Sequence, residues 1–196
     1  MRIVIVGNGI HPGWRNRDGT AKNWSEHIDA ADQVVRINAP HYYQLGFTGT
    51  KTTIMVVRSA CSGYGKKIVS QDGVSICDAV ISQVKKLVVI GFDDDPDADA
   101  AILPYLTRYP KLSPTSVGSY LLYPSCQLSL CKEIGITARP TAGAYTIDYI
   151  RGVFPEAFIE LAGWYWNEKL FASHDLMAEK VWIDSLVSSK VAAYLE

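Results

Sequence analysis

The sequence predicts one α/β domain in which a mostly parallel β-sheet has helices on both faces. Short, β-rich apolar runs alternate along the chain with longer segments whose apolar residues recur at helical spacing. The chain has 196 residues and is 48% hydrophobic, which is enough for one core but would be cramped for two. Because no repeat or Pro/Gly/Ser-rich linker divides it, residues 1–196 are predicted to fold as a single domain.

Six apolar runs are expected to be short, largely buried strands, because parallel strands covered on both faces are nearly continuously apolar. They span residues 2–6, 33–37, 53–57, 87–90, 158–161 and 191–194. Five segments have the spacing of helices, at residues 73–84, 98–107, 125–133, 141–153 and 175–188. Residues 109–124 contain three prolines and are expected to form a long loop or lid.

The composition argues against several functional classes. A formal net charge of -1 and a pI near 6.4 give no broad basic surface, so nucleic acid is not an expected partner. No apolar run approaches the roughly 18 residues of a membrane span, and the N-terminal apolar run is too short for a signal peptide. Without CxxC spacing, the cysteines are expected to be reduced thiols of a cytoplasmic protein; they are Cys61, Cys77, Cys126 and Cys131.

Gly7, Asn8 and Gly9 directly follow the first predicted strand. Ligands of open α/β sheets bind beyond the carboxyl ends of strands, where glycines let the backbone approach an anion. The Asn8 side chain can both donate and accept hydrogen bonds there. A plain strand-ending turn is the alternative. The spacing of Gly7, Gly9 and Gly13 misses the dinucleotide fingerprint by one residue, which leaves a dehydrogenase as a second alternative.

Arg36 and Asn38 are expected on the same face of the second strand, at its carboxyl end. A buried cation needs a partner, so Arg36 requires either a carboxylate such as Asp29 or Asp32, or an anionic ligand. Asn38 is expected to contact a ligand. Lys51, in a nearby turn, either reaches a phosphate or is a solvated lysine.

A second anion-binding position is predicted at the start of the helix near residue 141. Thr141 follows Pro140 and is a good N-cap. The small residues Ala142 and Gly143 then leave the free N–H groups of the first turn open to an anion. An ordinary capped helix is the alternative.

His174 precedes the last predicted helix, for which Ser173 or Asp175 can serve as the cap. A histidine titrates near neutral pH, so it can remove a proton from a hydroxyl group. Glu179, about one turn further on, could orient this histidine or complete the binding site. A structural histidine at a helix start is the alternative.

These motifs, taken in order, resemble the sialyl motifs of glycosyltransferase family 29. The segments V-G-N (residues 6–8), V-V-R-I-N-A-P (34–40) and G-T-K-T-T (49–53) resemble the large motif. R-P-T-A-G (139–143) resembles the start of the small motif, and His174 with Glu179 matches the very small motif, H-x4-E. The layout is also similar to that of the bacterial family 42 sialyltransferases.

The resemblance implies a Rossmann-like, GT-A-type variant that transfers sialic acid from a CMP-sugar to a hydroxyl of a glycan or glycolipid, with inversion and without a metal or other cofactor. A related sugar such as Kdo is an alternative. His174 would be the catalytic base, with Glu179 beside it. The donor-binding set would comprise Gly7, Asn8, Gly9, Arg36, Asn38, Thr141, Ala142 and Gly143.

The sequence also departs from the animal enzymes. It lacks the cysteines that join their large and small motifs, and their stem and membrane anchor, so a cytoplasmic bacterial or viral type is expected, at most peripheral to a membrane that carries the acceptor. Tyr165 and Trp166 are the only remnants of the aromatic motif before the last histidine.

Two other classes stay open. Asp93 and Asp95 form a D-x-D pair of the kind that holds a divalent ion in metal-dependent nucleotide-sugar transferases, although a solvated acidic loop that caps the next helix is the preferred interpretation. The second class is a non-catalytic nucleotide- or sugar-binding module.

Overall fold

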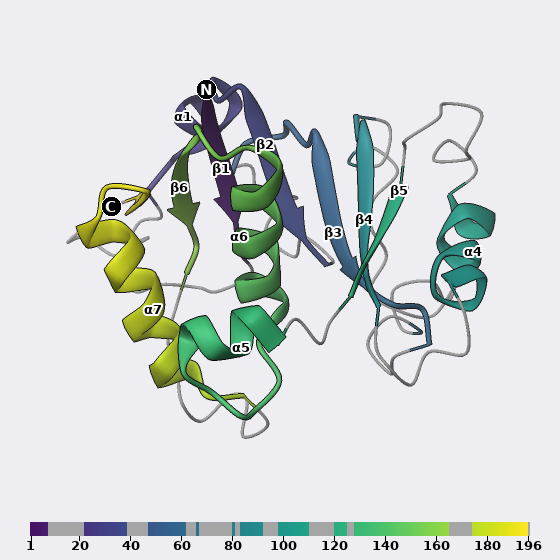
Figure 1. The fold of residues 1–196 in the computed structure, drawn as a ribbon. Coiled ribbons are helices and arrows are strands. Elements are labelled where there is room, and N and C mark those ends of the chain that lie inside the picture. The colour runs from purple at the N-terminus through teal and green to yellow at the C-terminus, as the bar shows by residue number, and fades with distance from the viewer. Residues whose placement is uncertain are drawn as a thin grey trace.

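The computed structural model describes residues 1–7, 22–38, 47–61, 66, 80, 83–91, 98–109, 120–124, 128–164 and 174–195. Seven strands form one sheet in the order β5-β4-β3-β2-β1-β6-β7, and every neighbouring pair is parallel (Figure 1). The strands are β1 (Arg2–Val6), β2 (Gln33–Ile37), β3 (Ile54–Arg58), β4 (Lys86–Gly91), β5 (Tyr120–Pro124), β6 (Phe158–Ala162) and β7 (Ala192–Tyr194).

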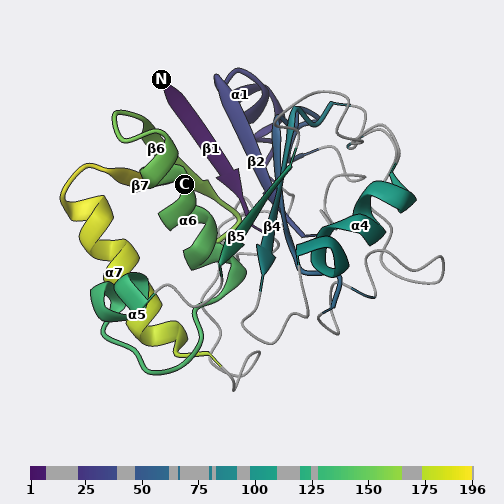
Figure 2. The same cartoon turned by 45° about the vertical axis from the view of Figure 1, so that its right-hand side comes forward.

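Helices cover both faces of this sheet, as Figure 2 shows. The described helices are α1 (Ser25–Asp29), α4 (Ala98–Arg108), α5 (Leu128–Ile134), α6 (Ala142–Val153) and α7 (Leu176–Ser188). Apolar side chains of α5, α6 and α7 share one core cluster with the sheet, whereas α4 and α1 pack on the sheet in two other clusters. The predicted α/β class, with a parallel sheet between two helical layers, is confirmed.

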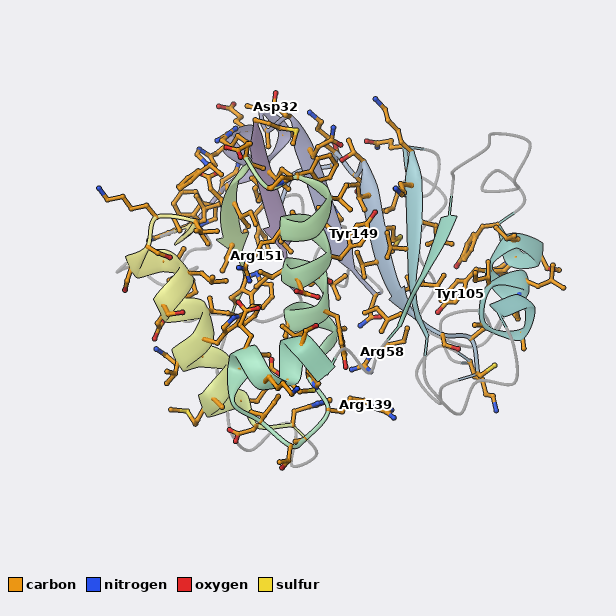
Figure 3. The ribbon with its side chains drawn as sticks, in the orientation of Figure 1. Asp32, Arg58, Tyr105, Arg139, Tyr149 and Arg151 are labelled. Atoms are coloured by element: carbon orange, nitrogen blue, oxygen red, sulfur yellow. The ribbon has the colours of Figure 1, made fainter. Side chains whose placement is uncertain are left out.

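The strand order creates a switch point at β1. The chain adds β2 to β5 on one side of β1 and then returns to add β6 and β7 on the other. In open parallel sheets, ligands bind at the carboxyl edge near such a reversal. Arg58 ends β3 and marks this edge, whereas Asp32 precedes β2 and marks the opposite one (Figure 3). Helices α6 and α7 each precede a strand, so their N-terminal ends lie at the carboxyl edge.

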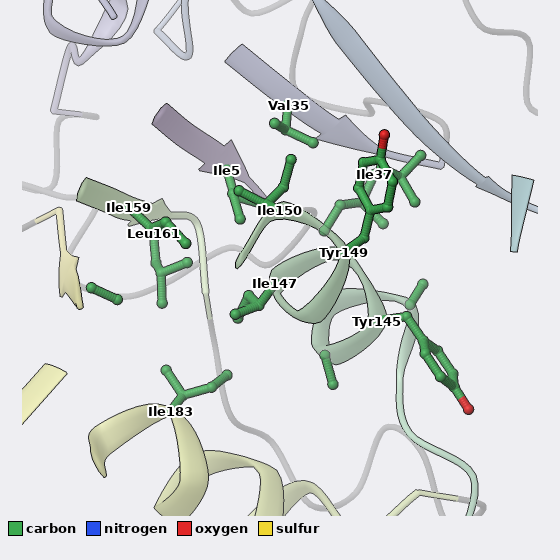
Figure 4. Packing of buried hydrophobic residues seen from close by; sticks show 14 of the residues in the cluster. Ile5, Val35, Ile37, Tyr145, Ile147, Tyr149, Ile150, Ile159, Leu161 and Ile183 are labelled. Atoms are coloured by element: carbon green, nitrogen blue, oxygen red, sulfur yellow. The ribbon is translucent and has the colours of Figure 1, made fainter. Parts of the chain in front are cut away.

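Strand side chains alternate between the two helical layers. In β1, Ile3 and Ile5 join the cluster under α6, whereas Val4 and Val6 join the cluster under α1. Figure 4 shows Ile147 and Ile150 of α6 facing the sheet side chains. Full burial of one such side chain contributes about 1.5–3 kcal/mol, so the apolar seam fixes α6, and with it the helix start at Thr141, above β1 and its neighbours.

One prediction is wrong in part. Residues 120–124, expected to belong to a loop, form the edge strand β5. Their Tyr-Leu-Leu-Tyr run is β-rich, and Pro124 is tolerated because it ends an edge strand. Residues 110–119 lie outside the described part, as does most of the helix predicted at 73–84.

Two further features concern the environment of the chain. Within the described ranges, no helix combines the length and apolar character needed to cross a membrane. Of the four cysteines, Cys61 and Cys131 lie in described segments, and both are free thiols.

Candidate functional site

Thr141 begins α6 at the carboxyl edge of the sheet. Its backbone is extended (φ -69°, ψ 164°), and its Oγ1 accepts a hydrogen bond from the Ala144 N–H at 3.2 Å. This is the predicted N-cap. The N–H groups of Ala142 and Gly143 are in the first turn, where an α-helix supplies no acceptor of its own. The helix start is therefore suited to an anion, as its sequence indicated.

Glu179 fastens α7 to this helix start. The side chain is 0% exposed. Its Oε1 accepts a hydrogen bond from the Thr141 N–H at 2.7 Å, and its Oε2 accepts one from the Thr141 hydroxyl at 2.6 Å. Burial raises the pKa of Glu179, and the two Thr141 hydrogen bonds oppose that shift. Of the two predicted roles, completion of the binding site fits these contacts, because both oxygens bind Thr141.

His174 lies at the same edge, just before α7. Asp175 is the N-cap of α7, since its Oδ1 accepts from the Ala178 N–H at 3.0 Å. The Nδ1 of His174 is 2.6 Å from the carbonyl oxygen of Arg139. A carbonyl only accepts, so this contact assigns the proton of the neutral ring to Nδ1 and leaves the lone pair on Nε2. The ring is thus placed to act as a base through Nε2.

The electrostatic surroundings keep His174 neutral. Burial lowers its pKa most, and the positive charges of Arg58 and Arg139 lower it further. The hydrogen bond to the Arg139 carbonyl acts in the opposite direction. The net shift is downward, so the imidazole is unprotonated at neutral pH, which is the form that a general base requires.

The charges of Arg58 and Arg139 act on His174, and neither residue was predicted from the sequence to belong to the site. Arg58 ends β3, where its carbonyl accepts a 2.6 Å hydrogen bond from the Tyr105 hydroxyl. Figure 3 shows both arginines at the carboxyl edge of the sheet. Burial lowers the pKa of Arg58, and the charge of Arg139 lowers it further. Arg139 is part of the R-P-T-A-G segment that the sequence analysis identified. Arg58 is a lone arginine at the end of an apolar strand and belongs to no such motif.

Asn38 directly follows β2 in the left-handed conformation (φ 55°), which asparagine tolerates better than most residues. Its Oδ1 accepts a hydrogen bond from the Arg58 N–H at 3.1 Å, and its own N–H donates to the Val56 carbonyl at 2.6 Å. The carbonyl end of the amide therefore holds β3. The NH2 group of Asn38 supplies two donors for a ligand contact.

Arg36 lies on the face of the sheet opposite α6, under the loop at residues 48–52. Its contacts with this loop are structural. The side chain is 1% exposed, and its guanidinium donates to the Thr52 hydroxyl at 3.0 Å and to the carbonyls of Thr48 at 2.8 Å and Gly49 at 2.9 Å. The structural alternative fits these contacts better than the donor-binding one. Hydroxyl and carbonyl oxygens of the loop occupy the place for which a carboxylate was expected.

The two carboxylates considered for Arg36 have other partners. Asp29 accepts from the backbone N–H groups of Thr50 and Lys51, both at 2.9 Å, and Asp32 accepts from the Arg2 N–H at 2.7 Å. The Lys51 ammonium donates to the carbonyl of Ala31. This hydrogen bond joins the loop to the segment after α1. It differs from both predictions for Lys51, a phosphate contact and a solvated lysine.

Two glycines of the predicted donor site are required by close packing at the β1–β6 switch point. A Cβ on Gly7 would lie 2.8 Å from the carbonyl oxygen of Gly163, and a Cβ on Gly143 would lie 2.7 Å from the ring of Trp164. The indole N–H of Trp164 donates to the Ile5 carbonyl at 3.2 Å, which fixes the ring between β1 and α6. Asn8 and Gly9 lie outside the described residues.

The chain matches no model of a protein family, and no curated protein matches its sequence. Its fold does match solved structures. A mammalian sialyltransferase superposes with a TM-score of 0.64 at 16% identity, over 99% of this chain and 68% of the other. The chain has a sialyltransferase-like fold. A second structure, of a mammalian sialyltransferase in complex with Gal-beta-1-3GalNAc-ortho-nitrophenol, gives a TM-score of 0.59 at 14% identity over the same shares.

The likeness to the Campylobacter jejuni sialyltransferase CstII is weaker, with a TM-score of 0.48 at 12% identity over 99% of this chain and 79% of that one, and it supports no conclusion. The sialyltransferase-like fold of this chain brings Thr141, Gly143, His174 and Glu179 to one edge of the sheet. The residues considered for the alternatives, Asp93 and Asp95, and for the aromatic motif, Tyr165 and Trp166, fall outside the described ranges.

Proposed function

We propose that this protein is a sialyltransferase that uses a CMP-sugar donor and a hydroxyl of a glycan or glycolipid as acceptor. The observation that carries the proposal is the double connection of segment 139–141 to His174 and to Glu179 of α7. His174 contacts the Arg139 carbonyl and Glu179 contacts Thr141. A neutral base is thereby held next to an anion-binding helix start, at the ligand-binding edge of a sialyltransferase-like fold.

In the proposed reaction, the donor lies across the carboxyl ends of β1 and β2. Gly7, Asn8, Gly9 and the NH2 group of Asn38 contact the nucleotide. The first-turn N–H groups of Ala142 and Gly143 bind an anionic group of the donor. Such preorganised donors stabilise the negative charge that develops as CMP departs.

His174 then acts on the acceptor. Its Nε2 removes the proton from a sugar hydroxyl while that oxygen forms a bond to the anomeric carbon of the donor sugar. The bond between the anomeric carbon and the phosphate oxygen breaks, CMP leaves with the electron pair, and the configuration inverts. Glu179 does not take part in proton transfer. It positions the helix start through Thr141.

The proposal is tested by transfer assays on purified protein. CMP-sialic acid and CMP-Kdo are supplied with oligosaccharide and glycolipid acceptors, and released CMP and glycan product are measured. His174→Ala is expected to lower transfer by about 10²–10⁴-fold. CMP affinity should change little, because the base acts on the acceptor. The activity of the parent protein should fall as the pH drops through the lowered pKa of His174, since the protonated ring cannot accept a proton.

A matched control is His27→Gln on α1, a histidine substitution at the opposite edge of the sheet. It should leave transfer within about twofold of the parent. Transfer at the parent rate by His174→Ala would remove this histidine from catalysis. Binding of CMP without turnover of either donor would instead favour the non-catalytic binding module.

A further inference from the structure

A side chain replaces a main-chain partner where the pairing of β2 with β3 ends. Ile37 lies opposite Val56 in this register, and the Asn38 N–H still donates to the Val56 carbonyl at 2.6 Å. In a regular parallel ladder, the next bond would join the Arg58 N–H to the main-chain carbonyl of Asn38. The positive φ of Asn38 ends the extended backbone, and its side-chain Oδ1 accepts from the Arg58 N–H instead, at 3.1 Å.

The main-chain carbonyl of Arg58 also binds a side chain. In the same register its donor would be the N–H of residue 40, but residue 40 is a proline and has none. The Tyr105 hydroxyl of α4 donates to this carbonyl at 2.6 Å. Tyr105 is 0% exposed and shares a core cluster with Met55 and Val57 of β3. Figure 3 shows Tyr105 beside α4 and Arg58 at the end of β3. The main chain of Arg58 is therefore held from two sides, by Asn38 and by α4.

The bond to Arg58 decides which way the Asn38 amide faces. A main-chain N–H only donates, so the amide presents its oxygen to Arg58 and directs its NH2 group elsewhere. The place of this NH2 group thus depends on the place of the Arg58 main chain, which the Tyr105 hydroxyl fixes. A second bond ties the same segment to α4, since the Ala60 N–H donates to the Ala101 carbonyl at 3.0 Å.

We propose that Tyr105 is a positioning residue of the site, which acts through the main chain of Arg58 to hold the Asn38 amide with its NH2 group toward a ligand. The ligand supplies an oxygen acceptor, such as a carbonyl or hydroxyl group of a nucleoside. Its identification as CMP rests on the function proposed above. Tyr105 itself does not touch the ligand, because it is fully buried under α4. A left-handed backbone at a non-glycine residue is strained and persists only where its surroundings fix it, which the bonds from Asn38 to β3 do.

The test is Tyr105→Phe, which removes the hydroxyl and keeps the ring. The side-chain NH2 signals of Asn38, assigned in 15N NMR spectra by their loss in Asn38→Gly, should shift or broaden. The Arg58 N–H should exchange faster with solvent. CMP affinity should fall by about 3–10-fold, the range expected for one hydrogen bond.

A double-mutant cycle separates positioning from a general loss of structure. Asn38→Gly removes the amide, and glycine accepts the left-handed backbone without strain. In that background Tyr105→Phe should change CMP affinity by less than about twofold, because the group that Tyr105 positions is gone. Tyr194→Phe is the matched control, since it removes a hydroxyl that donates to Asp184 at 2.8 Å, on the other side of β1. It should leave CMP affinity and the Asn38 signals unchanged.

The outcomes distinguish this inference from the proposed function. Asn38 signals that respond to Tyr105→Phe in a protein that binds no CMP would keep the link and reject the proposed donor. An equal loss of CMP affinity with and without the Asn38 side chain would reject the link, as would Asn38 signals that do not respond. If Tyr105→Phe does not fold, hydrogen exchange of the parent protein decides. CMP should then slow exchange of the Ala60 N–H as well as that of Arg58, and an unchanged Ala60 would reject the link to α4.

Discussion

The orientation of His174 is set by a main-chain atom. Its Nδ1 faces the Arg139 carbonyl, which lies two residues before the N-cap Thr141. A carbonyl cannot change protonation state, so it fixes one tautomer over the whole pH range in which the ring is neutral. The proposed base and the helix start are consequently positioned by the same short segment. A shift of that segment would displace both at once, which matters because catalysis depends on placement to a fraction of an ångström.

Gly143→Ala tests the close packing at the helix start. The new Cβ would lie 2.7 Å from the Trp164 ring, and the ring cannot move freely because its N–H binds the Ile5 carbonyl. We expect a loss of about 1–3 kcal/mol in the free energy of unfolding, measured with urea, and weaker CMP binding.

Gly152→Ala is the control for that substitution, because it lies in the same helix with nothing within 4 Å of the added Cβ. It should leave CMP binding unchanged and stabilise the protein by about 0.4–1 kcal/mol. Equal effects of the two substitutions would show that helix propensity, and not the contact with Trp164, governs position 143.

At the scale of single residues, the sequence predicted what local chemistry determines. Thr141 and Asp175 could be recognised as caps because capping depends only on the next few residues. Arg58 could not be recognised, because the groups that it acts on, Arg139 and His174, are distant in sequence. Arg36 was ambiguous for the same reason. Its partners in residues 48–52 depend on how the loop folds over the sheet.

The contact between α7 and α6 depends mainly on Glu179. Glu179→Ala would leave the N–H and hydroxyl of the part-buried Thr141 without this acceptor, at a cost of at most about 1–3 kcal/mol for each group that water does not reach. We expect a clear loss of stability in urea unfolding, together with lower transfer activity. Glu179→Gln has nearly the same shape and keeps an acceptor for the Thr141 N–H, so it should retain most of the stability.

The pH dependence of stability separates the charge of Glu179 from its shape. Because burial raises its pKa, the native state holds this proton more strongly than the unfolded state. The contribution to stability is full below the unfolded pKa and is lost as the pH rises through the raised native value. The parent protein should therefore lose stability relative to Glu179→Gln between acid and neutral pH. A constant difference across that range would indicate that the carboxylate is not destabilised by burial.

Elements were predictable where the apolar pattern was continuous. The bounds of β1 and β2 agree with the predicted ranges, and β3, β4 and β6 differ by one residue at one or both ends. In β5, the prolines before the strand and at its end concealed a short β-rich run, and its pairing with β4 could not be inferred locally. Helix α1, with five residues, is too short to show helical periodicity.

The fold of the molecule matches a solved structure, although its sequence matches no model of a protein family. Its structure covers 99% of the chain in the match to a mammalian sialyltransferase, yet only 16% of the aligned residues are identical. A parallel sheet between helices requires mainly apolar strands of suitable volume, and many sequences satisfy that requirement. Fold class was therefore within reach of the sequence, whereas the joining of β3, α6 and α7 into one site required the assembled sheet.

Ligand-dependent stability tests the site in the intact protein. CMP should raise the melting temperature without added divalent ions, and a chelator should not abolish the shift, because helix N–H groups and arginines supply the positive potential. At a CMP concentration 100 times Kd the stabilisation is about 2.7 kcal/mol. Stabilisation by UDP-sugars that requires manganese, and that Asp93→Asn or Asp95→Asn removes, would favour a metal-dependent transferase.

The position of β1 has a consequence for biosynthesis. Of the seven described strands, β1 leaves the ribosome first, but one of its two edges pairs with β6, where Ile3 lies opposite Ile159. At typical translation speeds of 5–20 residues per second, the roughly 150 intervening residues take about 10–30 s to make. During that interval an apolar strand of the interior of the future sheet has an open edge, which is a template for pairing with other chains. Nascent chains released before residue 158 should therefore aggregate and require chaperones, however stable the finished protein is.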